Sequence, residues 1–270
     1  MRYLFRNWDD LARRITNSYL MLFLDYDGTL TPIAESPSGA LIPKETKKVL
    51  KELSKNPKCK LAVITGRSLK DIRKRVGLRS IIYSGNHGLE IEGPKIRFEV
   101  QVPPDYRSIL QQIYRELSER LSKCKGVLLE NKGLVLALHY RLVGKRQVPF
   151  VRAAFHKVVT PYLWRTKIAI ETGKKVLEVR PSMVWGKGRA VLWLFSRQKS
   201  LEPDKRILPI YVGDDATDED AFKTLKNDGL TVFVGNPRKS DAQYCLKGTK
   251  EVFEFLKSLS DLLSANSLSL

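Results

Sequence analysis

The sequence predicts an α/β fold in which a parallel sheet with helices forms a core and a smaller α+β domain is inserted into it. Two observations support this fold class. Short apolar runs alternate with segments of helical periodicity, so strands are expected at residues 19–24, 60–64 and 80–84 and helices at residues 43–56 and 69–76. This βαβαβ alternation gives parallel strands joined by crossover helices. A break then starts a block of different order, and 270 residues with 43% hydrophobic content can build both cores.

The break is the segment Val102-Pro103-Pro104-Asp105, in which Asp105 is placed to cap a helix that runs to about residue 123. Two strand pairs with a helix between them follow, at residues 126–130, 134–140, 149–163, 167–171 and 175–179. Glycine-containing turns at Asn131-Lys132-Gly133 and Thr172-Gly173-Lys174 favour antiparallel hairpins. We therefore expect an inserted αββαββ cap domain at residues 104–180.

The α/β pattern resumes after Arg180-Pro181. Helices are expected at residues 187–196, 219–226 and 251–263, and strands at residues 207–212 and 230–234. Residues 1–103 and 181–270 are thus expected to form one core domain.

The first strand is followed by Asp25-Tyr26-Asp27-Gly28, which sets two carboxylates close together. Open α/β sheets place their ligand crevices at the carboxyl ends of strands. Because burying two unpaired carboxylates costs several kcal/mol per ion, we expect a cation between them. The alternative is a simple loop, since Asp and Gly are common turn residues.

Three further groups fall at the carboxyl ends of predicted strands or at adjoining helix starts: Thr65-Gly66-Arg67, Gly186-Lys187-Gly188, and Gly213-Asp214-Asp215 with Asp218. Such ends share one edge of a parallel sheet. Carboxylates, a hydroxyl, an ammonium group and helix N-termini together suit the binding of a phosphate against Mg2+. Taken singly, the groups also fit a strand end, a flexible linker and an acidic helix start.

The order of these motifs resembles the haloacid dehalogenase (HAD) superfamily of aspartate-nucleophile phosphatases. Within it the chain is similar to the trehalose-6-phosphate phosphatases, which carry a C2-type cap. The matching motifs are Asp25-Tyr26-Asp27-Gly28-Thr29-Leu30, Thr65-Gly66-Arg67, Gly85-Asn86-His87-Gly88-Leu89-Glu90, Leu177-Glu178-Val179-Arg180-Pro181, Gly186-Lys187-Gly188 and Gly213-Asp214-Asp215-Ala216-Thr217-Asp218-Glu219-Asp220. The resemblance implies a HAD-like Rossmannoid core and a phosphoric monoester hydrolase that releases phosphate from trehalose 6-phosphate, with Mg2+ as cofactor, in trehalose biosynthesis.

By the same resemblance, Asp25 is expected to attack phosphorus and form an aspartyl-phosphate, while Asp27 serves as general acid and then as base. Thr65 and Lys187 are expected to stabilise the phosphoryl charge. The expected ligands of Mg2+ are the Asp25 carboxylate, the Asp27 main-chain carbonyl and the Asp214 carboxylate, with Asp215 and Asp218 as supporting or alternative ligands.

Residues that select the substrate are expected in two places. His87 lies in a loop of polar neighbours, and Asn86, His87 and Arg67 are placed to line the cleft. The cap is expected to contribute a polar sheet face that binds sugar hydroxyls, through Glu130, Lys132, His139, Arg141, Glu178 and Arg180. The alternative for this face is an ordinary solvated sheet surface.

The charge of the chain leaves other partners open. A net charge of +19 and a pI of 9.8 are compatible with nucleic acid, an anionic membrane or an anionic small molecule. The densest basic run, residues 44–60, has the spacing of a solvated helix face, and no RNA-binding or zinc-finger motif accompanies it. We therefore expect a phosphosugar substrate, no nucleic-acid or membrane partner, and a monomer.

Compartment and redox state follow from two further features. The longest apolar runs, residues 19–24 and 190–195, are far shorter than the roughly 18 residues of a spanning helix. Cys59, Cys124 and Cys245 lack metal or disulfide spacing. A cytoplasmic enzyme with reduced thiols is expected.

Two alternatives to hydrolysis of trehalose 6-phosphate remain open at this point. The first is a related capped phosphatase that acts on sucrose phosphate, a mannosyl-phosphoglycerate or another phosphosugar. The second is a basic nucleic-acid-binding protein with a vestigial phosphatase site, which predicts binding that weakens steeply with salt.

Overall fold

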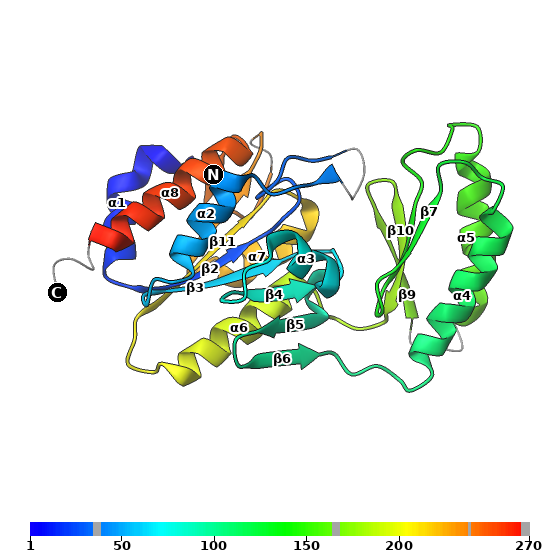
Figure 1. Ribbon diagram of the computed structural model, residues 1–270, viewed down its shortest axis with the longest axis horizontal. Coiled ribbons are helices and arrows are strands. Elements are labelled where there is room, and N and C mark those ends of the chain that lie inside the picture. Colours follow the sequence, from blue (N-terminus) through cyan, green and yellow to red (C-terminus); the bar gives the residue numbers. More distant parts are fainter. Residues whose placement is uncertain (35–38, 164–167, 237–238, 266–270) are drawn as a thin grey trace. The chain divides into compact units, whose positions relative to one another are not determined.

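The computed structural model describes residues 1–34, 39–163, 168–236 and 239–265. The described chain forms two compact units (Figure 1). The larger unit consists of Met1–Glu99 and Trp185–Leu270, and the smaller unit consists of Val100–Val184. The smaller unit is therefore a single insertion between two segments of the larger one.

The larger unit is built on a nine-stranded sheet in the order β1-β13-β12-β11-β2-β3-β4-β5-β6. Its strands are β1 (Arg2–Tyr3), β2 (Tyr19–Leu24), β3 (Cys59–Ile64), β4 (Ile82–Gly85), β5 (Glu90–Gly93), β6 (Ile96–Glu99), β11 (Ile207–Gly213), β12 (Leu230–Val234) and β13 (Tyr244–Leu246). All neighbouring strands from β1 to β4 in this order are parallel, and β5 and β6 extend the sheet as an antiparallel hairpin. The predicted parallel core is confirmed.

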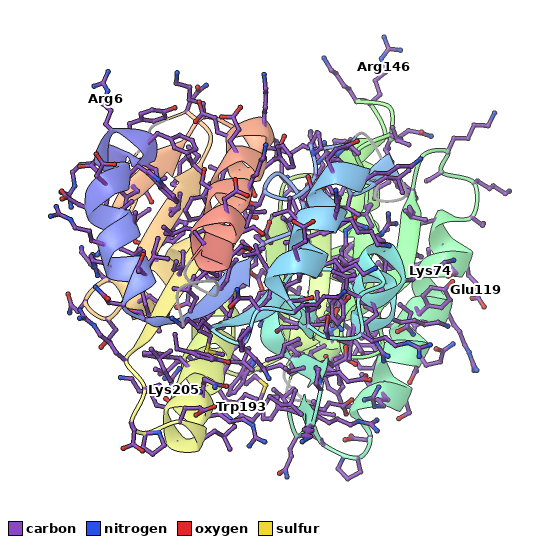
Figure 2. The ribbon with its side chains drawn as sticks, turned by 60° about the vertical axis from the view of Figure 1, so that its left-hand side comes forward. Arg6, Lys74, Glu119, Arg146, Trp193 and Lys205 are labelled. Atoms are coloured by element: carbon purple, nitrogen blue, oxygen red, sulfur yellow. The ribbon has the colours of Figure 1, made fainter. Side chains whose placement is uncertain are left out.

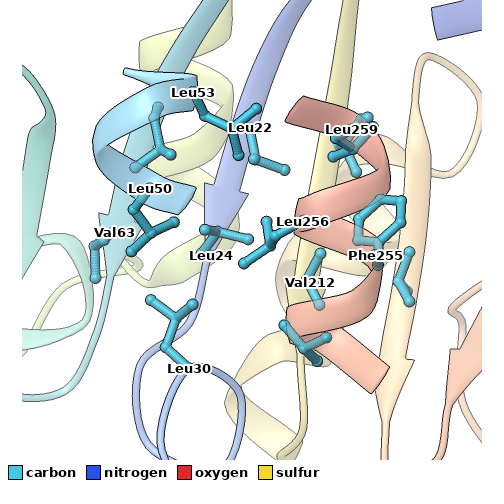
Figure 3. Packing of buried hydrophobic residues seen from close by; sticks show 14 of the residues in the cluster. Leu22, Leu24, Leu30, Leu50, Leu53, Val63, Val212, Phe255, Leu256 and Leu259 are labelled. Carbon is cyan, nitrogen blue, oxygen red and sulfur yellow. The ribbon is translucent and has the colours of Figure 1, made fainter. Parts of the chain in front are cut away.

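Helices cover both faces of this sheet. They are α1 (Trp8–Thr16), α2 (Lys44–Leu53), α3 (Leu69–Val76), α6 (Lys187–Leu201), α7 (Glu219–Leu225) and α8 (Thr249–Ala265). The alternation along β2 sends Leu22 into the cluster with α1, α2, α3 and α8, and Phe23 into the cluster with α6 and α7. Figure 3 shows Leu24 of β2 between Leu50 of α2 and Leu256 of α8 in the first of these clusters. Both faces of β2 are thus buried, as a central parallel strand requires.

The smaller unit is a four-stranded antiparallel sheet in the order β7-β8-β10-β9, with two helices. Its elements are α4 (Tyr106–Leu121), β7 (Leu128–Asn131), β8 (Leu136–His139), α5 (Val148–Leu163), β9 (Ile168–Gly173) and β10 (Val176–Pro181). Both helices lie on one side of the sheet (Figure 1). The order of the elements is the predicted αββαββ, and the pairing of each hairpin is antiparallel as expected.

Alternation along β10 separates the two faces of the small sheet. Leu177 and Val179 are fully buried, whereas Glu178 and Arg180 point to the opposite face. Cross-strand partners share a face, so Glu171 of β9 lies on the same face as Glu178. The polar face of the small sheet therefore lies on the side away from its apolar core.

Several sequence expectations need correction. Asp105 stands at the start of α4, but its side chain makes no cap hydrogen bond. The turn expected at Thr172-Gly173-Lys174 lies later, because β9 continues to Gly173 and Lys175 takes the positive φ of 67°. The elements β1, α1, β5, β6 and β13 were not expected. Lys167, the first residue of an expected strand, lies outside the described residues.

The lysines of α2 lie on a solvent-exposed helix face, as their spacing predicted. Those at positions 44, 48 and 51 are exposed, while Val49, Leu50 and Leu53 are buried. Cys59, Cys124 and Cys245 are free thiols. Within the described residues, no helix has the length and apolar character needed to cross a membrane.

Candidate active site

The site begins where two neighbouring strands end. Because β2 and β11 run parallel, with Leu24 opposite Val212, the segments that follow them leave the sheet at the same edge. Asp25 directly follows β2 and is 4% exposed, and Asp214 directly follows β11. One carboxylate oxygen from each of Asp25, Asp214 and Asp218 lies within 4.8 Å of the others. The edge of the sheet therefore concentrates negative charge.

A glycine allows this close approach. Gly28 has a φ of +86°, in the left-handed region, and a Cβ atom built there would lie 2.1 Å from Asp214 Oδ2. The backbone that follows Asp27 thus lies directly against the carboxylate of Asp214. A side chain at position 28 would separate the two acidic segments.

Lys187 supplies the positive charge of the cluster. It is the first residue of α6, and its buried ammonium group donates to Asp25 Oδ1 at 2.7 Å and to Asp218 Oδ1 at 2.8 Å. Burial opposes the charged form, but the carboxylates of Asp218 and Asp25 outweigh it and raise the pKa of Lys187 well above its ordinary value. The lysine is therefore fixed as a cation beside Asp25.

Asp218 organises the loop around this lysine. Its Oδ1 accepts from Lys187 and from Tyr211 Oη at 2.6 Å, and its Oδ2 accepts from the backbone N–H groups of Asp214 and Asp215, each at 3.0 Å. Both carboxylate oxygens of Asp218 thus already accept hydrogen bonds from the protein. Its position favours a structural task over direct metal binding, although it belongs to the cluster of three carboxylates.

Asp215 differs from its neighbours. It precedes the short helix η4 (Ala216–Asp218), and its Oδ1 accepts from Thr217 N at 2.8 Å. Burial opposes ionisation, but Lys187 and the hydrogen bonds from Thr217 prevail and lower the pKa of Asp215 to about 2. Its side chain is 53% exposed. Asp215 is therefore an ionised cap at the rim of the site.

The charges at the site do not balance. Burial, with the neighbouring carboxylates, raises the pKa of Asp25 well above its ordinary value and that of Asp214 to about 7. Burial is the larger cause for both groups, and Lys187, which pairs with Asp25, Asp215 and Asp218, offsets it only in part. A hard divalent cation would relieve this repulsion, and carboxylate oxygens are the ligands that Mg2+ prefers. The residues fit that ion.

Asp27 is held by an arginine. Arg67 donates from Nε to Asp27 Oδ2 at 2.7 Å and from Nη2 to Asp27 Oδ1 at 2.6 Å, which makes the pair bidentate. The guanidinium also donates to Asp71 and lies 5.3 Å from the centre of the Tyr26 ring. Arg67, predicted to contact substrate, thus orients Asp27 in this structure.

The turn that follows β4 supports Thr65. Asn86 N donates to Arg67 O at 2.7 Å, and His87 N donates to Thr65 O at 2.9 Å. The His87 ring covers Gly66, where an added Cβ would lie 2.5 Å from Nε2. Asn86 is completely buried and donates from Nδ2 to Glu90 Oε2 at 2.5 Å. The structure therefore brings Asn86 and His87 to the loop that carries Thr65, where these contacts are with the protein.

Five of the six predicted substrate residues of the smaller unit lie in contacts between an acidic and a basic side chain on one sheet face. Lys132 Nζ donates to Glu178 Oε1 at 2.9 Å, and His139 Nε2 lies 3.3 Å from Glu130 Oε2. Arg180 pairs with Glu171, which was not predicted as a site residue although the hairpin register places it opposite Glu178. Each of these basic groups therefore lies next to a carboxylate.

Arg141 stands apart from these pairs. It lies beyond the end of β8, and its Nη2 donates to Lys174 O at 3.4 Å. The expectation that Arg141 lies on the sheet face with His139 is therefore wrong, because the strand ends at His139.

Comparison with known proteins gives a consistent result. Residues 23–252 match the family model described as trehalose-phosphatase. Trehalose-phosphate phosphatase B of Arabidopsis thaliana is 33% identical over 264 residues, covering 93% of this chain and 69% of that protein. The structure of the C-terminal domain of trehalose-6-phosphate phosphatase from C. albicans matches with a TM-score of 0.78 and 25% identity, covering 97% of this chain and 99% of that one.

A more distant structure extends the match of the fold. A haloacid dehalogenase-like hydrolase from Bacteroides thetaiotaomicron has a TM-score of 0.64 at 15% identity, covering 90% of this chain and 100% of that one. The predicted HAD-like fold is confirmed.

Proposed function

Because the chain belongs to the trehalose-phosphatase family, we propose that this phosphatase hydrolyses trehalose 6-phosphate to trehalose and phosphate, with Mg2+ as cofactor. The observation that carries the proposal is the buried contact of Lys187 with Asp25, beside Asp214. This arrangement sets a fixed cation and a carboxylate at one point, where a phosphoryl group needs both a nucleophile and charge stabilisation.

In the first step, a carboxylate oxygen of Asp25 forms a bond to phosphorus while the bond from phosphorus to the sugar oxygen breaks. Protonated Asp27 gives its proton to that oxygen, and trehalose leaves. In the second step, Asp27 accepts a proton from water, the water oxygen bonds to phosphorus, and the bond to Asp25 breaks. Arg67, which donates to both oxygens of Asp27, orients the ionised carboxylate that serves as base in the second step, and one of these hydrogen bonds would open when Asp27 carries the proton of the first step.

The remaining groups stabilise charge. The Lys187 ammonium group, already 2.7 Å from Asp25, would pair with the phosphoryl oxygens as negative charge shifts during transfer. The hydroxyl of the buried Thr65 would donate to another of these oxygens. Mg2+, held by Asp25, Asp214 and the main-chain carbonyl of Asp27, would supply further charge neutralisation when bound.

We assign substrate choice to the smaller unit, residues 100–184, as a cap. Its polar face carries carboxylates and bases in pairs, and such groups can exchange hydrogen bonds with many sugar hydroxyls. The residues proposed to contact the disaccharide are Glu130, Lys132, His139, Glu178 and Arg180, with Arg141 at the edge of this face.

The test is phosphate release from a panel of phosphosugars, with and without Mg2+. Trehalose 6-phosphate should give the highest kcat/KM, and chelation should abolish turnover. Equal rates with glucose 6-phosphate, or a preference for sucrose phosphate or a mannosyl-phosphoglycerate, would refute the substrate while leaving the chemistry intact.

A further inference from the structure

We propose that Trp185 is a positioning residue of the phosphoryl-transfer site, because its indole ties the segment that carries Lys187 to the turn that supports Thr65. The inference rests on the proposed chemistry, in which Lys187 and Thr65 stabilise the same phosphoryl group. It uses only residues of the larger unit.

The first contact is polar. Trp185 Nε1 donates to the carbonyl oxygen of Gly88 at 2.7 Å, and Trp185 precedes Lys187 by only two residues. Gly88 has a φ of +103°, and an added Cβ would lie 2.7 Å from Ala190 Cβ and 3.0 Å from Gly186 O. The turn is thus in direct contact with the start of α6, and the indole hydrogen bond adds a second link between the turn and this segment.

The same turn holds the other phosphate-binding segment. Asn86 and His87 donate their backbone N–H groups to Arg67 O and Thr65 O, and the His87 ring covers Gly66. One turn of three residues, η3 (Asn86–Gly88), therefore joins the Thr65 loop to the Lys187 helix. A shift of this turn would move both groups relative to Asp25.

The turn needs such support because of its backbone. Asn86 and His87 have φ values of 50° and 57°, and Gly88 follows with a third positive φ. Left-handed conformations of residues other than glycine cost energy and persist only where the surroundings hold them. The Gly88 carbonyl is the point at which Trp185 holds this strained turn.

The second contact of Trp185 is apolar and separable from the first. Its ring stacks on Phe98 with a centroid distance of 5.1 Å and an interplanar angle of 22°. Trp193, labelled in Figure 2, also lies against Phe98, at 4.7 Å. Trp185→Phe keeps an aromatic ring on Phe98 but removes the N–H donor, whereas Trp193→Phe and Phe98→Leu change the aromatic cluster and leave the donor in place.

The experiment compares W185F, W193F and F98L with the wild-type chain. We expect W185F to lower kcat by about 10- to 100-fold, the size of effect that a small misplacement of catalytic groups produces, with KM changed less than about twofold. Its affinity for orthovanadate, which mimics the five-coordinate phosphoryl group, should fall by the same factor as kcat. We expect W193F and F98L to keep the wild-type kcat, although F98L should lower Tm.

Three results would overturn the proposal. One is a W185F variant with the kcat and vanadate affinity of the wild type. Another is a loss of kcat in F98L or W193F as large as that in W185F, which would mean that activity follows the aromatic packing. The third is a W185F variant that is unfolded at the assay temperature, which would make the role of Trp185 structural.

Failure of the proposed substrate is distinguishable from failure of this inference. If the wild-type chain hydrolyses a phosphosugar other than trehalose 6-phosphate, the same variants are compared on that substrate.

Discussion

The molecule has two polar regions, the acidic site of the larger unit and the polar sheet face of the smaller unit. They differ in how many carboxylates each basic group contacts. At the acidic site, Asp25, Asp215 and Asp218 share the single ammonium group of Lys187, and Asp214 lies beside them. On the small sheet, Lys132 and Glu178 form one pair, and His139 with Glu130 and Arg180 with Glu171 form two more.

This difference indicates what each region binds. A site with excess buried negative charge demands a cation, and that cation then attracts phosphate. A face on which carboxylates lie beside basic groups offers hydrogen-bond donors and acceptors to a neutral polyol. We therefore propose that the first region performs the chemistry and that the second recognises the sugar.

The largest effect is expected from Asp25→Asn. Removal of the nucleophile should lower kcat by at least about 10⁴-fold, since residues that form the covalent intermediate dominate the barrier. Circular dichroism and Tm should show an intact fold, because the change removes a buried charge. Asp204→Asn, at an exposed position, is the control and should keep full activity. Substantial turnover by D25N would exclude the aspartyl-phosphate route.

The second prediction concerns pH and the cation. The folded pKa of Asp214, about 7, lies above the ordinary 3.8, so the stability linked to its proton is complete below pH 3.8 and is lost as the pH rises through 7. Mg2+ should replace that proton and raise Tm more at pH 8 than at pH 5.5. At 100 times its Kd, a bound ion contributes about 2.7 kcal/mol.

Asp214→Asn sharpens this prediction. The variant lacks the titrating carboxylate, so its Tm should respond less to Mg2+ and the response should vary less with pH. A wild-type Tm that Mg2+ raises equally at both pH values would show that the acidic site does not hold protons as described.

A smaller loss of activity is expected from a substitution on the polar face of the small sheet. Glu178→Gln should raise KM for trehalose 6-phosphate about 10- to 100-fold, because the Lys132 donor and the sugar hydroxyls lose their charged acceptor. Hydrolysis of p-nitrophenyl phosphate, which has no sugar, should keep its kcat. Glu119→Gln, on the exposed side of α4, is the control. An equal loss on both substrates would place Glu178 in the chemistry.

The smallest effect is expected from His139→Gln. The pair of His139 with Glu130 is partly exposed, and such pairs contribute less than about 1 kcal/mol. KM should therefore change by less than about fivefold, with no change in Tm beyond a few degrees. A larger rise in KM than that of E178Q would reverse the order of importance on this face.

The parallel core and the acidic edge could be predicted because their signals are local. The apolar run before Asp25 and the glycine next to Lys187 each mark a strand or helix end within a few residues. Strand β13 and the hairpin of β5 and β6 were missed because three- and four-residue strands carry too little periodicity.

The contacts between distant residues could not be predicted. Nothing near Asp27 in the sequence indicates that Arg67 holds both of its carboxylate oxygens, and nothing near Asp25 indicates that Lys187 donates to it. These contacts arise because neighbouring parallel strands bring separated loops to one edge. The pair of Arg180 with Glu171 could have been predicted more easily, since the hairpin register alone places the two strands side by side.

The most direct test of the contrast is the substrate selectivity of the double variant K132M/E178Q. The measurement is the ratio of kcat/KM for trehalose 6-phosphate to kcat/KM for p-nitrophenyl phosphate. If the polar face of the small sheet recognises the sugar and the acidic site performs phosphoryl transfer, this ratio falls at least about tenfold. The rate on p-nitrophenyl phosphate then stays at the wild-type value. An unchanged ratio in a folded variant would contradict the assignment of recognition to the smaller unit.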